Sequence, residues 1–190
     1  MIRNRRLLAR LIPMAGLIVL GVWLALPATV EAQELYTYTV GVLGGVGGSY
    51  DVDPGSSYGN HGFQINLGLV TEPKTVLGLR VGRLSLNDKP TFGSLTNADL
   101  TFADIAGEYR FDETYYQSGV YLGLGAYRLR GKRDGLFERE QTAVGGVLGL
   151  TGEFPLNSHF GIILDLAGHY TPLDEAKIFV TGNAGVAFHF

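Results

Sequence analysis

The stretch Phe63-Gln64-Ile65-Asn66-Leu67-Gly68-Leu69 alternates strictly between large apolar residues and small or polar ones. Successive side chains of a β-strand point to opposite faces, so this alternation predicts a strand with one apolar and one polar face. The same pattern recurs between residues 158 and 170 and between residues 178 and 190. No segment after residue 32 shows a sustained helical period, which favours an all-β chain.

Eight such segments follow one another along the chain. We expect strands at residues 35–47, 60–71, 75–86, 100–111, 117–130, 141–154, 158–170 and 178–190. A strand of about ten residues that rises ~3.3 Å per residue and is tilted by about 40° has a height of roughly 25 Å, which matches the apolar band of a transmembrane barrel.

The connections between these segments alternate in length. Long polar connections follow the first, third, fifth and seventh segments, at residues 48–59, 87–99, 131–140 and 171–177. Short turns lie at residues 72–74, 112–116 and 155–157. Barrels of the outer membrane have short periplasmic turns and longer extracellular loops. The sequence therefore predicts an eight-stranded antiparallel up-and-down transmembrane β-barrel, with its four long loops extracellular and both termini periplasmic.

Aromatic residues gather where the predicted strands meet the short turns or the termini. These residues are Tyr36, Tyr38, Tyr109, Phe111, Phe154, Phe160, Phe188 and Phe190. Membrane barrels carry girdles of aromatic side chains at the boundary between lipid and water. We interpret this group as the periplasmic girdle.

The first 32 residues have the pattern of a secretory signal peptide. Four arginines lie within residues 1–10, an apolar run covers residues 11–30, and Val30-Glu31-Ala32 places small residues before the expected cleavage site. The alternative is an uncleaved membrane helix, because the apolar run is long enough to span a bilayer. We predict cleavage after Ala32, export by the secretory pathway and a barrel domain at residues 33–190.

Composition excludes several classes of function. The 190-residue chain has 28 glycines, no cysteine and a net charge of −3. The lack of cysteine excludes a disulfide framework, a thiolate metal site and a cysteine nucleophile. The slightly acidic charge does not favour nucleic-acid binding.

The C-terminal residues carry a resemblance to a known class of proteins. The chain ends Asn183-Ala-Gly-Val-Ala-Phe-His-Phe190, with Val186, Phe188 and Phe190 on one face of the last strand. This ending resembles the signal that the barrel-assembly machinery reads in outer-membrane proteins. With its eight strands, the chain resembles the small barrels typified by the OmpA membrane domain, OmpX, OmpW and the opacity-type proteins.

The resemblance implies a protein of the outer membrane of a Gram-negative-type bacterium. We expect a monomer without enzymatic activity, with a structural or surface-interaction role, and with lipid and lipopolysaccharide around it. A narrow channel, or a barrel that binds a small or apolar solute, is the alternative that the likeness to OmpW allows. A lipid A-modifying hydrolase is a third and less favoured possibility.

The polar faces of the predicted strands hold charged residues that would lie inside the barrel. Eight strands enclose a space that side chains or one small ligand can fill, which excludes an open pore. We expect the inward charges to form a structural network, with Arg80 paired to Asp104 or Glu108. Inward glycines would make room for the longer side chains. The residues of the expected network are Arg80, Asp104, Glu108, Arg110, Glu153 and Asp165, with Arg110 paired to Glu153.

Histidines and acids do not make a convincing catalytic or metal site. His169 shares the inward face with Asp165 and precedes Thr171, which resembles the histidine and hydroxyl of lipid A deacylases. Threonine stands there in place of serine, and His169 points away from lipid, where such a substrate would lie. The remaining histidines belong to different strands at different heights. We therefore expect no catalytic residue, no metal and no cofactor.

The third long connection concentrates positive charge. Together with the end of the strand that precedes it, it contains the cations Arg128, Arg130, Lys132, Arg133 and Arg139. At the outer rim such side chains could bridge lipopolysaccharide phosphates. The alternative is a solvated loop, because Asp134, Glu138 and Glu140 offset much of this charge.

Overall fold

A computed structural model describes residues 37–50, 57–86, 95–112, 115–133, 137–173 and 177–190. The expected signal peptide and Tyr36 lie outside these ranges. None of the described residues belongs to a helix that could cross a membrane.

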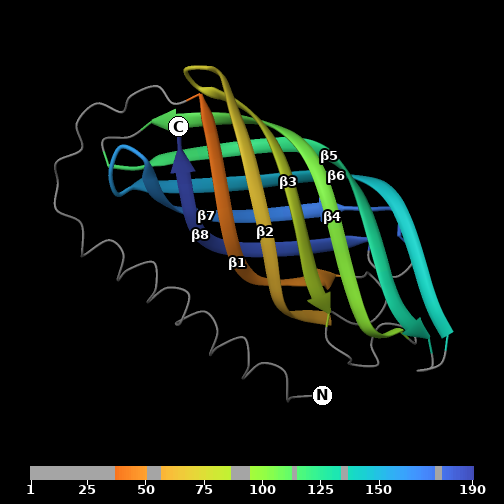
Figure 1. Cartoon of the computed structure of the whole chain (residues 1–190). Helices are drawn as coiled ribbons and strands as arrows, with labels where there is room; N and C mark the ends of the chain where they lie inside the picture. Colours follow the sequence, from red (N-terminus) through yellow and green to blue (C-terminus); the bar gives the residue numbers. More distant parts are fainter. Residues whose placement is uncertain (1–36, 51–56, 87–94, 113–114, 134–136, 174–176) are drawn as a thin grey trace, which may run out of the picture. The chain divides into compact units, whose positions relative to one another are not determined.

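Eight antiparallel strands form a closed barrel in which each strand pairs with the next and β1 pairs with β8 (Figure 1). This confirms the predicted fold class. The strands are β1 (Tyr38–Tyr50), β2 (Ser57–Glu72), β3 (Thr75–Leu86), β4 (Leu95–Asp112), β5 (Gln117–Arg133), β6 (Phe137–Pro155), β7 (Phe160–Tyr170) and β8 (Ile178–His189).

The largest departure from the expected boundaries is the connection predicted at residues 131–140. There β5 continues to Arg133 and β6 begins at Phe137, so most of the expected loop is a paired hairpin. Its polar composition suggested a loop because it has no apolar face. Cross-strand ion pairs between β5 and β6 support the hairpin instead. The strands β4, β5 and β6 have 18, 17 and 19 residues, whereas β7 has 11.

The apolar faces of the strands point outward. Leu67 is 44% exposed and Leu124 is 70% exposed, whereas the inward-facing Leu43 of β1 is only 1% exposed. A soluble sandwich would bury its apolar faces against each other. The outside of this barrel is therefore the apolar surface, as a lipid-facing wall requires.

The described aromatic residues at the short-turn end form contacts with one another around the rim. The rings of Tyr38 and Phe190 stack with centroids 5.7 Å apart, and those of Phe160 and Phe188 are 5.1 Å apart. Tyr38 and Phe190 also exchange two backbone hydrogen bonds, which join β1 to the C-terminus. Closure of the barrel and the aromatic girdle thus coincide at this seam.

The largest apolar cluster of the interior lies toward the long connections, whereas the charged side chains lie toward the short turns together with smaller apolar clusters. The apolar cluster consists of Leu84, Leu86, Ala98, Leu100, Phe102, Tyr127, Leu129, Leu173 and Phe179. Inward glycines make room for large side chains, as expected. A Cβ atom at Gly82 would collide with the Phe102 ring, and one at Gly149 would collide with the Tyr121 ring.

Candidate functional site

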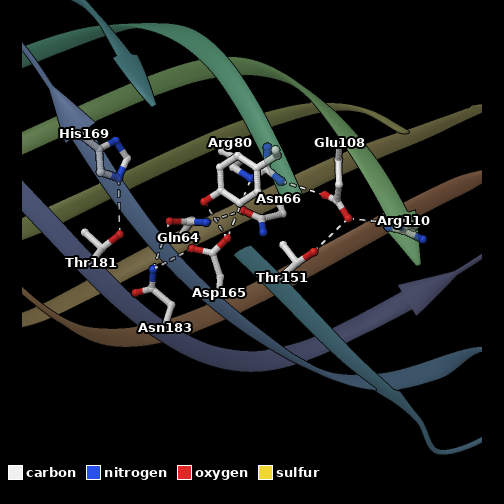
Figure 2. Close-up of polar contacts among 11 residues, drawn as sticks. Gln64, Asn66, Arg80, Glu108, Arg110, Thr151, Asp165, His169, Thr181 and Asn183 are labelled. Atoms are coloured by element: carbon white, nitrogen blue, oxygen red, sulfur yellow. Dashed lines mark hydrogen bonds and ion pairs between the residues drawn. The ribbon is translucent and has the colours of Figure 1, made fainter. Parts of the chain in front are cut away.

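Arg80 of β3 lies at the centre of the polar half of the interior (Figure 2). Its Nη2 atom donates to Glu108 Oε2 at 2.9 Å, and its guanidinium lies 3.5 Å from the centroid of the Tyr121 ring. Its Nε atom is 4.0 Å from Asp165 Oδ2. Of the two expected partners of Arg80, the structure selects Glu108. The cation–π contact with Tyr121 adds a second stabilising interaction in a site removed from water.

Glu108 is shared between two arginines. Its Oε1 atom accepts from Arg110 Nε at 3.1 Å and from the Thr151 hydroxyl at 3.0 Å. The expected pairing of Arg110 with Glu153 is therefore wrong: Arg110 contacts Glu108, which lies two residues away on the same face of β4. Same-strand spacing at i and i+2 was the signal that could have indicated this pair.

Glu153 pairs instead with His189, a residue that sequence reasoning did not connect to the interior charges. The Nε2 atom of His189 contacts Glu153 Oε1, and its Nδ1 atom lies 3.2 Å from the Thr39 hydroxyl. These contacts connect β8 with β6 and β1. Because the three residues are far apart in the chain, only closure of the barrel brings them together.

Asp165 belongs to a hydrogen-bonded chain of mostly uncharged side chains. Its Oδ2 atom accepts from the Tyr121 hydroxyl at 2.9 Å, and Asn183 lies 3.5 Å from its other oxygen. Asn183 also donates to Gln64 at 3.2 Å, and Gln64 donates to Asn66 at 2.7 Å. Neutral hydrogen-bond donors thus stabilise Asp165, for which only ion pairs were expected.

Asp104 lies directly across from Arg80 in the β3–β4 register, but the two do not form an ion pair. Asp104 is 1% exposed, and neither of its carboxylate oxygens has a hydrogen-bond partner among the described residues. The Nε and Nη1 atoms of Arg80 also have none in that part of the chain. The interior charges are therefore incompletely paired, which carries a desolvation cost.

His169 lies in the apolar half, above the charged layer. Its ring stacks on Phe179 with centroids 4.3 Å apart and an interplanar angle of 5°. Its Nδ1 atom is 3.2 Å from the Tyr127 hydroxyl, and its Nε2 atom is 3.4 Å from the Thr181 hydroxyl. Both ring nitrogens thus face hydroxyl groups rather than Asp165. These contacts differ from the histidine–carboxylate arrangement that a hydrolase triad uses.

Charged side chains form the outer rim of the barrel wall. Arg128 and Arg130 of β5 face outward and pair with Glu140 and Glu138 of β6, at 2.7 and 2.9 Å. Lys132 is also exposed on this face. The side chains of the other two expected lipopolysaccharide contacts, Arg133 and Arg139, lie outside the described residues. The Arg128 hydrogen bond holds the pKa of Glu140 below its ordinary value.

A second rim cluster, on β3 and β4, was not predicted. Arg83 donates to Asp99 through two nitrogens, at 2.7 and 3.3 Å, and Ser85 donates to Asp99 at 2.9 Å. The hydrogen bond from Arg83 lowers the pKa of the Asp99 carboxyl. Arg83 follows Leu79 and Val81 on the outward face of the same strand. This change from apolar to charged residues was the signal in the sequence.

The polar half of the interior contains a cavity of about 30 Å³. It is lined in part by Asn66, Gly78, Arg80, Glu108 and Arg110. A cavity of this size can hold a water molecule or a monatomic ion. In the described part of the chain no group of three or more histidines and acids could hold a metal ion.

Comparisons with known proteins identify the fold. No family model matches the chain, and no curated protein does. Among solved structures, it is similar to Neisserial surface protein A, with a TM-score of 0.68, 15% identity and coverage of 84% of this chain and 100% of that chain. The attachment invasion locus protein Ail of Yersinia pestis matches with a TM-score of 0.58, 12% identity and coverage of 82% and 100%.

The outer membrane protein OprG of Pseudomonas aeruginosa also matches, with a TM-score of 0.58, 11% identity and coverage of 85% and 99%. At these identities the similarity concerns the fold alone. The chain has the fold of the small eight-stranded outer-membrane β-barrels.

Proposed function

We propose that this protein is a non-enzymatic β-barrel of the bacterial outer membrane with a structural and surface-interaction role. The observation that carries the proposal is the inverted polarity of the barrel. Exposed apolar side chains cover the outside, an aromatic girdle borders them at one end, and charged pairs border them at the other. Such a surface is stable in a bilayer and would aggregate in water.

The filled interior supports a role that does not involve transport. The apolar cluster around Phe102 and Phe179 occupies one half of the barrel, and the Arg80 network occupies the other. We expect no single-channel conductance in planar bilayers, and no new conductance in an Arg80→Ala variant. A conductance that Arg80→Ala changes would instead favour the narrow-channel alternative.

The long connections are the part of the protein that we place outside the cell. The hairpin of β5 and β6 extends the outward row of Arg128, Arg130 and Lys132 beyond the apolar band. A guanidinium has five donors, so an arginine that is paired with a carboxylate retains donors for a phosphate oxygen. We propose lipopolysaccharide phosphates as the partners of this row, together with Arg133 and Arg139.

The C-terminal strand supports a proposal about assembly. Val186 and Phe188 of β8 face outward, and so does Phe190, which follows the strand. We propose that this row is presented to the barrel-assembly machinery during biogenesis. Deleting Phe190 should then reduce the amount of folded protein in outer membranes, measured by immunoblot, without reducing its synthesis.

Orientation and membrane insertion can be tested together because the chain has no cysteine. A single cysteine at Lys132→Cys should react with a membrane-impermeant maleimide on intact cells, whereas Lys74→Cys in the β2–β3 turn should react only after lysis. Both variants should migrate faster on gels when unheated than when boiled. Equal labelling of the two positions on intact cells would contradict the proposed orientation. Absence of the gel shift would contradict the membrane barrel.

A further inference from the structure

The cavity beside Arg80 is lined by more hydrogen-bond donors than acceptors. Its walls include two guanidinium groups, those of Arg80 and Arg110, and a single carboxylate, that of Glu108. Both oxygens of Glu108 already accept hydrogen bonds, one from Arg80 and the other from Arg110 and Thr151. Asp104 and Asp165 do not line this cavity. The lining itself therefore holds more donors than free acceptors, although Asp165 lies 4.0 Å from Arg80 Nε outside this lining.

Arg80 brings an unpartnered donor to this wall. Arg80 is 4% exposed, and its Nη1 atom has no hydrogen-bond partner among the described residues. A Cβ atom placed on Gly78, another residue of the cavity wall, would lie 3.2 Å from Nη1. The free donor thus lies over the bare backbone of Gly78. A buried charged donor without an acceptor is costly, so an acceptor that fits the cavity is stabilising.

Asn66 adds a further donor. Its amide oxygen accepts from Gln64 at 2.7 Å, so the group it has left to offer is the amide nitrogen. Figure 2 shows Asn66 beside Arg80 and Glu108 between Arg80 and Arg110. The cavity volume of about 30 Å³ is sufficient for one monatomic ion.

We propose that this cavity binds a monovalent anion of the size of chloride, held by Arg80, Arg110 and the amide of Asn66. The anion would supply the acceptor that Arg80 Nη1 lacks among the described residues. The site is independent of the proposed surface role, because it lies inside the barrel.

The test compares chloride with gluconate, a larger organic anion, at constant ionic strength. A ligand that binds only the folded state raises the unfolding midpoint as its concentration passes its Kd. The urea midpoint of the purified barrel in detergent should rise with chloride and then level off. Gly78→Ala adds one methyl group at the cavity wall without changing any charge, and it should abolish most of this rise. Gly107→Ala is the matched control on β4, where an added Cβ meets no atom within 4 Å, and it should keep the full rise.

Equal midpoints in chloride and gluconate, or the same rise in Gly78→Ala as in the wild type, would overturn the proposal. If Gly78→Ala does not fold, Asn66→Ala serves as the second variant and should reduce the rise. Crystals soaked in bromide should show one anomalous peak between Arg80 and Arg110. A peak found only at another position would indicate an adventitious ion only and would also overturn the proposal.

Discussion

Removing the hydroxyl of Tyr121 tests the interior network most directly. The hydroxyl donates to Oδ2 of the buried Asp165 carboxylate at 2.9 Å, whereas Asn183 lies 3.5 Å from the other oxygen. Tyr121→Phe removes this hydroxyl but keeps the ring that fills the space at Gly149 and lies under Arg80. A hydrogen bond to a charged group contributes about 1.5–3 kcal/mol. We therefore expect the free energy of unfolding to fall by about 2 kcal/mol.

Urea titration of the barrel in detergent micelles, read from the folded and unfolded bands of unheated samples on gels, measures this change. Tyr109→Phe is the matched control, because Tyr109 faces outward and is 47% exposed. The control should change the free energy of unfolding by less than about 0.5 kcal/mol. An equally small loss in Tyr121→Phe would refute the view that Asp165 depends on this hydroxyl.

Three further outcomes are expected. Glu108→Gln leaves the buried Arg80 and the partly buried Arg110 without their shared carboxylate and should cost about 3–5 kcal/mol by the same titration; a loss under about 1 kcal/mol would contradict the shared ion pair. Leu124→Arg places a charge on the apolar outside and should cost about 2–4 kcal/mol in lipid vesicles, whereas Thr142→Arg at the rim should cost about 0–1 kcal/mol; equal costs would contradict the assigned band. The folded-state pKa of Asp99 is lowered below 3.8, so the stability that it contributes with Arg83 is present above that pH and is lost as the pH falls through the folded-state value. The urea midpoint of Asp99→Asn should therefore fall less between pH 6 and pH 3 than that of the wild type, and an identical fall would contradict the pair.

The barrel itself was predictable because its determinants are local. The alternation through Phe63 and Leu69 assigns the two faces of β2 without any knowledge of its neighbours. The alternation of long and short connections then orders the strands, because a hairpin turn joins adjacent antiparallel strands. The same local rule failed at residues 131–140. There the strands continue above the apolar band, where both faces are polar and the pattern that marks a strand is lost.

The interior contacts depend on tertiary structure. The sequence placed Arg80, Glu108 and Asp165 inside the barrel by parity, which is a property of each strand alone. It did not determine that Arg110 would join Arg80 at Glu108, or that His189 would reach Glu153 from β8.

What the sequence determined by itself was which side of each strand meets lipid, and therefore that the chain closes into a cylinder with a polar interior. Only the tertiary structure decided which inward groups meet. Partners from different strands depend on the register and on the stagger around the closed barrel, and a shift of two residues preserves every face while it exchanges every partner. That Arg80 Nη1 lacks a partner among the described residues depends on this stagger, because the acceptors that it could reach belong to other strands.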